Sequence, residues 1–184
     1  MKITIGITGA SGSLYGYTLL RLLSSLQVSC DIVVTEMGQK VLQHECGLCP
    51  QDLAAYGTLY ENSDLFSPLA SGSYKSGGMV VAPCSMNTLG GIAGGTGGSL
   101  LSRCAAVTLK ERRPLVLLVR ETPFSTIHLE NMLRLSQAGA CIMPASPGFY
   151  HRPTEIWQQV EGLCTRVLDQ LHIEVPSAKR WEGA

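Results

Sequence analysis

The sequence predicts an α/β protein: a doubly wound parallel sheet in a Rossmann-like or flavodoxin-like three-layer sandwich. Short β-branched or continuously apolar segments alternate along the chain with segments whose apolar residues recur every three or four positions, the pattern of alternating strands and helices. Residues 79–83 (MVVAP) and 115–119 (LVLLV) are continuous apolar runs, as expected of parallel strands covered on both faces. Such a sheet binds its ligands beyond the carboxyl ends of its strands.

The first strand is expected over residues 2–8, which are short, β-branched and followed at once by glycines. The next segment, residues 13–26, is expected to be a helix because its leucines recur at helical spacing. Further strands are expected at 31–35, 79–83, 115–119 and 140–143, and further helices at 36–46, 51–56, 99–111, 125–138 and 154–171.

Two segments carry additional expectations. Residues 57–78 are rich in Ser, Gly and Tyr and are expected to form a long ordered loop, a length that favours a functional role. In the last helix the apolar residues at helical spacing predict a buried stripe, made of Ile156, Val160, Leu163, Val167 and Leu171.

Composition predicts one domain over residues 1–184 and a homo-oligomer. The chain has 14 basic and 14 acidic residues and only 15% charged residues, so no overall field favours nucleic acid or an anionic membrane. Mean hydropathy is +0.18, yet no apolar run approaches the roughly 20 residues of a membrane span. Apolar surface is therefore expected in subunit contacts, with the tail, residues 172–184, packing on a neighbouring subunit.

Cysteine and acidic residues argue against a metal site. The seven cysteines are an odd number and lie mostly in apolar stretches, which predicts reduced, buried thiols. A cytoplasmic protein is expected because residues 2–8 resemble a strand and not the h-region of a signal peptide. Cys46 and Cys49 form a C-x-x-C pair, but with no second pair a structural or incidental role is favoured over zinc or redox chemistry. The aspartates lie far apart and the histidines have no metal-ligand spacing, so the chemistry is expected to be metal-independent.

The opening segment GITGASGSLYG, residues 6–16, indicates a phosphate-binding turn. Its glycines do not follow the G-x-G-x-x-G spacing, and Thr35 stands where a dinucleotide site has an acidic residue. A single phosphate held by hydroxyl and N–H donors is favoured over an NAD-type cofactor. The alternative is that these glycines only form a tight turn between strand and helix.

A second set of small donors follows residues 79–83, at the start of another helix. It consists of Ser85, Met86, Asn87 and Thr88. Simple helix capping is the alternative interpretation. Together with the first segment, this set favours a mononucleotide such as FMN.

Basic residues concentrate in the second half of the chain. Arg120 directly follows LVLLV and is expected at the carboxyl edge of the sheet. The run 110–113 (KERR) ends a helix, where favourable placement on the helix dipole is the alternative. Three or four such donors could hold a phosphate without a metal, because each charge-assisted hydrogen bond contributes about 1.5–3 kcal/mol.

Several segments together resemble the UbiX-like flavin prenyltransferases over nearly the whole chain. They are GITGASGSLYG, ASGSYKSGGMVVAPCSMNTL, AAVTLKERRPLVLLVRETPFSTIHLENML, PASPGFYHRP and the closing Arg180-Trp181. The resemblance implies an enzyme that transfers a dimethylallyl group from dimethylallyl phosphate to N5 and then C6 of reduced FMN. It also implies that UbiD-like decarboxylases receive the prenylated FMN, and that the protein is a homo-oligomer, often a dodecamer, with sites between subunits.

The resemblance assigns site residues by position. Those expected to bind FMN are Gly9, Ala10, Ser11, Thr35, Ser85, Met86, Asn87, Thr88 and Arg120. Those expected to bind the phosphate of the prenyl donor are Arg103, Lys110, Tyr150 and Arg166, the last reaching in from a neighbouring subunit. The catalytic residues implied are Ser11, Glu45, Glu121 and Lys110; sequence alone would make Glu45 an ordinary helix-surface carboxylate.

Two other functions remain open at this point. An FMN-dependent cysteine decarboxylase has a similar serine- or asparagine-bearing segment, but it uses a mid-chain histidine, and this chain has none between His44 and His128. A non-catalytic flavin carrier subunit would give no role to four of the assigned residues, which are Lys110, Glu121, Tyr150 and Arg166. Leu65-Phe66 stands where some relatives carry a Trp, which leaves open whether the donor is a monophosphate or a diphosphate.

Overall fold

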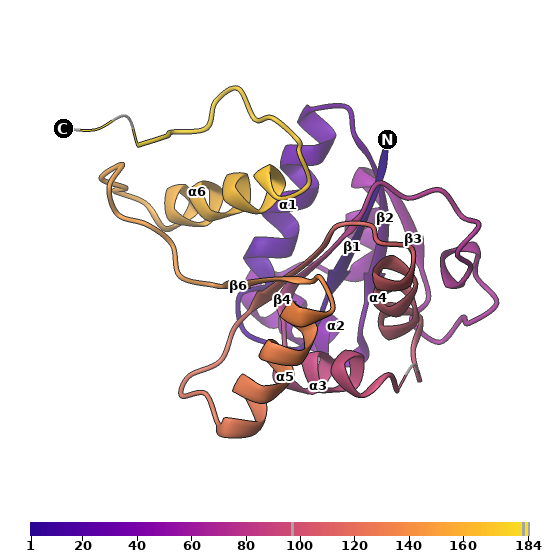
Figure 1. The fold of residues 1–184 in the computed structure, drawn as a ribbon. Helices are drawn as coiled ribbons and strands as arrows, with labels where there is room; N and C mark the ends of the chain where they lie inside the picture. The colour runs from indigo at the N-terminus through magenta and orange to yellow at the C-terminus, as the bar shows by residue number, and fades with distance from the viewer. Residues whose placement is uncertain (97, 182, 184) are drawn as a thin grey trace.

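A six-stranded parallel sheet lies between two layers of helices in the computed structural model, which describes residues 1–96, 98–181 and 183 (Figure 1). The strand order is β3-β2-β1-β4-β5-β6, the doubly wound order whose direction reverses between β1 and β4. The strands are β1 (Lys2–Ile7), β2 (Ser29–Val34), β3 (Thr58–Tyr60), β4 (Met79–Cys84), β5 (Leu115–Val119) and β6 (Cys141–Pro144).

The helices divide between the two faces of the sheet. One core contains apolar residues of α1, α2 and α6, and the other those of α3, α4 and α5. The helices are α1 (Ser13–Ser25), α2 (Glu36–Cys46), α3 (Met86–Gly94), α4 (Leu100–Lys110), α5 (Thr126–Gln137) and α6 (Ile156–Asp169), with 3-10 helices η1 (Pro50–Tyr56) and η2 (Pro68–Ala70). The predicted fold class is confirmed, and the ranges expected for α2 and β5 are those observed.

Two elements differ from the sequence-based expectations. The predicted loop 57–78 contains β3, a three-residue strand that pairs only with β2 at the edge of the sheet. Helix α3 has three glycines among its nine residues, and glycine disfavours helix, so only its start at Ser85 was predictable.

The expected stripe on the last helix is wrong at its first member. Ile156 is 74% exposed, whereas Val160, Leu163, Val167 and Leu171 are buried. Ile156 is the first residue of α6, and this end of the helix projects beyond the sheet (Figure 1).

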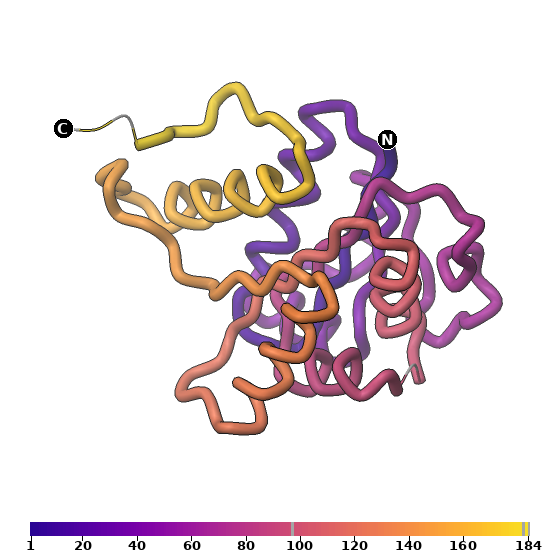
Figure 2. The backbone as a smooth tube through the Cα atoms, in the orientation of Figure 1, coloured from indigo at the N-terminus to yellow at the C-terminus, as the bar shows by residue number. Residues whose placement is uncertain are grey.

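The chain after α6 turns back and runs beside that helix, as the backbone trace shows (Figure 2). Tyr150 and Asp169 both bond to this segment, at Lys179 and Arg180 respectively. Contact of the tail with a neighbouring subunit stays a prediction, and residues 182 and 184 of the tail lie outside the described residues. Across the described part of the chain, no helix has the length and apolar character needed to cross a membrane.

Candidate active site

An open groove with a cavity volume of about 1020 Å³ lies at the carboxyl edge of the sheet. The N-termini of α2, α3, α4 and α5 all reach it, through Thr35, Ser85, Ser99 and His128. The N–H groups and dipole at the start of a helix favour an anion. The groove is therefore electrostatically suited to a phosphate-bearing ligand.

Hydroxyl groups cap these helices. The Thr35 Oγ1 accepts a hydrogen bond from the Gly38 N–H at 3.1 Å, and the Ser85 Oγ accepts one from the Thr88 N–H at 3.3 Å. The capping interpretation of Ser85 is thus correct. The Ser85 hydroxyl caps the N–H of Thr88, the third residue of α3. The first two N–H groups of a helix have no partner within the helix, so those of Met86 and Asn87 remain available to a ligand.

Three glycines on α3 keep the groove wide. A Cβ added at Gly90, Gly91 or Gly94 would meet no atom closer than 3.5 Å, and all three residues line the groove. A glycine within a helix costs about 0.5–1 kcal/mol relative to alanine. The glycines therefore make α3 less stable than alanines would, but they leave its backbone open to a flat ligand in the groove.

Thr8 joins the loops that follow β1 and β4. Its fully buried Oγ1 donates to the Pro83 carbonyl at 2.7 Å and accepts from the Ser85 N–H at 2.9 Å.

Close packing explains two of the nearby glycines: a Cβ at Gly9 would lie 2.6 Å from the Met37 Cβ, and one at Gly16 would lie 2.4 Å from the Ala82 carbonyl oxygen.

Replacing Thr8 with valine should lower the free energy of unfolding by about 1–3 kcal/mol, because the Pro83 carbonyl and the Ser85 N–H would lose a buried partner. Denaturant unfolding measures the change. Thr4→Val is the matched control: Thr4 is a buried residue of β1, the strand that Thr8 follows, and the described residues include no hydrogen-bond partner for its hydroxyl. Equal losses in both variants would contradict the role assigned to Thr8.

Glu45, in the last turn of α2, reaches the glycine-rich turn. Its Oε2 accepts from the Gly12 N–H at 2.9 Å and from the Ser13 N–H at 2.8 Å. Partial desolvation raises the pKa of Glu45, but the Ser11 hydroxyl, the two backbone N–H groups and the charge of Arg120 outweigh it and lower the pKa. The N–H groups at the start of α1 therefore already bind an anion, the Glu45 carboxylate of the same chain.

Arg120 and Glu121 follow β5 at the same edge of the sheet. Both line a second cavity of about 290 Å³ together with residues that follow β6. The Glu121 Oε1 accepts from the Thr122 N–H at 3.0 Å. Ser11 hydrogen-bonds to Glu45, and the charge of Arg120 acts on the same carboxylate. Glu121 lies beside Arg120 in the second cavity.

The residues expected to hold the donor phosphate do not meet within one chain. Arg103 Nε donates to the Ala70 carbonyl at 3.0 Å, and Lys110 pairs with Glu111 at the end of α4, beyond the amino edge of the sheet. Tyr150 and Arg166 lie near α6 and the tail. Their convergence therefore requires residues from more than one subunit, as the resemblance implies, and it stays a prediction.

Sequence reasoning missed several residues of the groove, and two of these hold helix N-termini. Asn62 caps α4 from the segment after β3: its Oδ1 accepts from the Leu101 N–H at 3.1 Å and its carbonyl accepts from the Leu100 N–H at 2.8 Å. His128 forms a capping box with Ser125, in which the His128 Nδ1 accepts from the Ser125 N–H at 3.2 Å. The sequence S-T-I-H at residues 125–128 has the spacing of a capping box, so the position of His128 could have been predicted. No local sequence pattern predicts the contact of Asn62 with α4.

All seven cysteines are free thiols. Burial raises the pKa of Cys84 and Cys104 to about 12, so these thiols are protonated at neutral pH. Within residues 1–96, 98–181 and 183, no cluster of three or more His, Cys, Asp or Glu side chains is placed to hold a metal ion.

Comparison with known proteins identifies the family of this chain. The family model described as Flavoprotein matches residues 1–165. The probable UbiX-like flavin prenyltransferase of Bacillus subtilis is 43% identical over 184 residues, which are 100% of this chain and 90% of the relative. These matches extend over the N-terminal turn, the groove and the residues around Arg120.

Two solved structures superpose closely on this chain. AnUbiX (PadA1), determined in complex with FMN and dimethylallyl pyrophosphate, has a TM-score of 0.97 at 38% identity, covering 100% of this chain and 98% of that one. The dodecameric FMN-dependent Ubix-like decarboxylase from Escherichia coli O157:H7 has a TM-score of 0.96 at 41% identity, covering 100% of both chains. Taken together, these matches show that the chain belongs to the Flavoprotein family and, within it, to the UbiX-like flavin prenyltransferases.

Proposed function

We propose that this protein is a flavin prenyltransferase, which transfers a dimethylallyl group from dimethylallyl phosphate to N5 and C6 of reduced FMN. The observation that carries the proposal is the groove at the carboxyl edge, into which several helix N-termini and a glycine-lined helix face open. The similar AnUbiX structure, in complex with FMN and dimethylallyl pyrophosphate, supports both ligand classes.

The groove has the chemistry that FMN requires. Thr35, Ser85 and Thr88 supply hydroxyl groups beside the amides at the start of α2 and α3, a donor set for a phosphate and a polyol chain. Met37 and Ile127 present apolar side chains that are 55% and 68% exposed in the groove, suited to a flat aromatic ring. The open face of α3 allows such a ring to approach closely.

Two carboxylates of the protein, Glu45 and Glu121, are proposed to act beside the flavin. Bound reduced FMN supplies the nucleophilic ring positions that accept the C5 unit. Because its pKa is lowered, Glu45 stays ionised at neutral pH and holds the Ser11 region in place. Glu121 is the carboxylate proposed to take up the proton that ring closure releases, acting as a general base.

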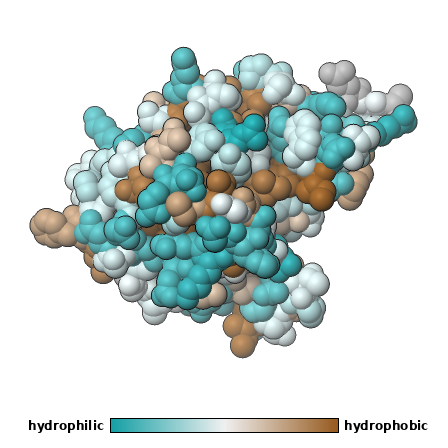
Figure 3. All heavy atoms as spheres, turned by 180° about the vertical axis from the view of Figure 1, so that it is seen from behind, coloured by the Kyte–Doolittle hydropathy of each residue, from teal (hydrophilic) through white to brown (hydrophobic). Residues whose placement is uncertain are grey.

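Ionisation of the prenyl donor needs fixed positive charge around its phosphate, because preorganised donors stabilise a leaving anion. Arg103, Lys110 and Arg166 are proposed to provide this charge across a subunit contact. Tyr150 is proposed to add a neutral hydroxyl donor. The dodecameric Escherichia coli relative supports such an assembly. Hydrophobic side chains also reach the surface, as the rear view shows (Figure 3), and exposed apolar patches mark interaction sites.

The proposal is tested by incubating the protein anaerobically with reduced FMN and dimethylallyl phosphate in the presence of a metal chelator, then measuring the mass of the extracted flavin. We expect a flavin heavier by one C5 unit. Dimethylallyl pyrophosphate in a parallel reaction identifies the donor. Unmodified FMN with both donors would reject the transferase and support a carrier.

Decarboxylation is the second candidate, because the similar Escherichia coli structure carries the name of a decarboxylase. An assay of CO2 release from aromatic acids and from cysteine-terminated peptides separates the two functions. CO2 formation by the purified protein without a partner would favour this second candidate over prenyl transfer.

Three wider expectations complete the proposal. UbiD-like decarboxylases are proposed to receive the product, and the protein is proposed to act in the cytoplasm, in keeping with its free thiols. Residues 1–184 are proposed to form a single FMN-binding domain.

A further inference from the structure

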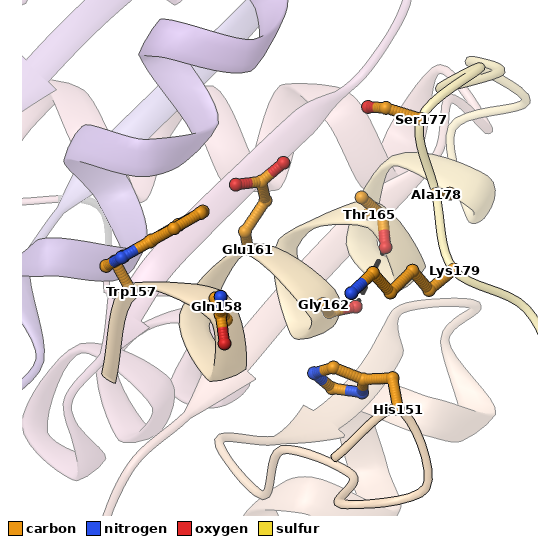
Figure 4. Close-up of a pocket in the computed structure, with 9 residues that line it drawn as sticks. All are labelled: His151, Trp157, Gln158, Glu161, Gly162, Thr165, Ser177, Ala178 and Lys179. Atoms are coloured by element: carbon orange, nitrogen blue, oxygen red, sulfur yellow. Dashed lines mark hydrogen bonds between the residues drawn. The ribbon is translucent and has the colours of Figure 1, made fainter. Parts of the chain in front are cut away.

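Two of the residues proposed to hold the donor phosphate, Tyr150 and Arg166, are connected through the C-terminal segment of the same chain. Tyr150 precedes α6, Arg166 lies within it, and residues 177–181 return alongside it (Figures 2 and 4). The contacts that join these parts converge on one carboxylate, that of Asp169 at the end of α6.

Asp169 accepts hydrogen bonds from two guanidinium groups. Arg180 binds it in a bidentate manner, with Nη1 3.0 Å from Oδ2 and Nη2 3.0 Å from Oδ1. Arg166 Nη1 donates to the same Oδ2. The hydrogen bond from Arg180 has the largest effect on the pKa of Asp169 and lowers it. Burial comes next and raises the pKa, but the charges of both arginines and the hydrogen bond from Arg166 lower it further, so the net shift is downward.

The tail also fixes Tyr150. The Tyr150 hydroxyl donates to the Lys179 carbonyl at 3.1 Å, and its ring packs edge-on to that of Trp181 with centroids 6.1 Å apart. Residues 179–181 therefore link Tyr150 to Asp169, and through Asp169 to Arg166.

The tail is packed more loosely as it moves away from the end of α6. Ile173 and Val175 are buried in the core that contains α6. A cavity of about 150 Å³ separates α6 from residues 177–179, with His151 and Trp157 in its wall (Figure 4). Ala178 still packs against that core, whereas residues 179–181 are exposed. The attachment of these last residues therefore depends on Asp169 and on the bond from Tyr150.

We propose that Asp169 is a positioning residue for the prenyl donor: it anchors the tail that holds Tyr150 and it orients the guanidinium of Arg166 toward the donor phosphate. The inference rests on the proposed function and on the role of Tyr150 and Arg166 in it. Asp169 itself does not contact the donor.

Asp169 can orient the Arg166 side chain and still allow it to leave for the donor phosphate. Arg180 occupies both oxygens of Asp169, so the carboxylate keeps a partner when Arg166 turns to a phosphate. The Arg166 side chain is 53% exposed, and restricting its rotamers beforehand reduces the entropy lost on binding. Two guanidinium groups against one carboxylate also leave a net positive charge for an anionic ligand.

Asp169→Asn distinguishes positioning from simple electrostatics, because the two effects have opposite signs. If only charge mattered, removing a carboxylate beside Arg166 would strengthen binding of an anionic donor. Positioning predicts the reverse: a KM for dimethylallyl phosphate higher by about three- to tenfold, a small change as expected for a partly exposed ion pair, with FMN affinity unchanged. Glu174→Gln is the matched control, since Glu174 also acts on Arg180 through its charge but forms no hydrogen bond to Arg166 or Arg180 among the described residues.

A second readout, independent of turnover, is hydrogen–deuterium exchange of residues 176–181 in the FMN-bound protein. We expect faster exchange in Asp169→Asn than in the unmodified protein or in Glu174→Gln. Unchanged exchange, or a donor KM that stays constant or falls, would overturn the positioning role even with turnover intact. Absence of turnover in the unmodified protein would reject the proposed function and with it this role, so the two failures are distinguishable.

Discussion

Replacing Glu121 with glutamine should slow formation of the prenylated flavin by about 10²- to 10⁴-fold, the range for removal of a general acid or base, while the Kd for FMN stays the same. Glu121 follows β5 and lines the cavity beside Arg120, and its Oε1 accepts from the Thr122 N–H. Glutamine retains an oxygen acceptor for that N–H but cannot take up a proton. The measurement is the initial rate under saturating reduced FMN and donor.

Glu130→Gln serves as the control, because Glu130 is an exposed carboxylate on α5. Its rate should remain near that of the unmodified protein. A Glu121→Gln variant that turns over at the normal rate would remove this carboxylate from the chemistry and leave Glu45 as the candidate base.

Arg166→Ala should raise the KM for dimethylallyl phosphate by about 10- to 100-fold, because one charge-assisted hydrogen bond contributes about 1.5–3 kcal/mol. FMN binding should change far less, since Arg166 lies on α6, away from the residues that line the groove. Donor titration at saturating FMN, together with a separate FMN titration, measures the two effects.

Arg134→Ala, at an exposed position in the last turn of α5, controls for the loss of a positive charge. Unaltered donor KM in Arg166→Ala would exclude this side chain from the phosphate site. Mixing Arg166→Ala with a Glu121→Gln variant adds a test of shared sites: recovery of activity in mixed oligomers would show that the two residues act from different subunits.

The sequence was most informative where local pattern and tertiary environment agree. The runs MVVAP and LVLLV predicted buried parallel strands. The first forms all but the last residue of β4, and the second forms the whole of β5. Helix α3 lacked such a signal because Gly90, Gly91 and Gly94 disfavour helix, and β3 lacked it because only its pairing with β2 stabilises so short a strand.

The site was predictable only in part, for a similar reason. The carboxyl-edge position of Thr35, Ser85 and Arg120 was predictable because each directly follows a strand of a parallel sheet. The contact of Glu45 with Gly12 and Ser13 joins two elements distant in sequence, so only the family resemblance pointed to Glu45. The cap that Asn62 gives α4 depends on the path of the segment after β3, which periodicity does not encode.

The central claim is that FMN lies in the groove along the glycine face of α3, and an FMN titration of Gly91→Leu tests it most directly. A leucine at this position would enter the open groove, where the nearest atom to a new Cβ, the Thr96 Oγ1, is 3.6 Å away. Helix propensity would improve by about 0.5–1 kcal/mol, so thermal stability should not fall. The account predicts an FMN Kd at least about 100-fold higher, equivalent to roughly 2.7 kcal/mol; FMN binding at unmodified affinity would contradict it.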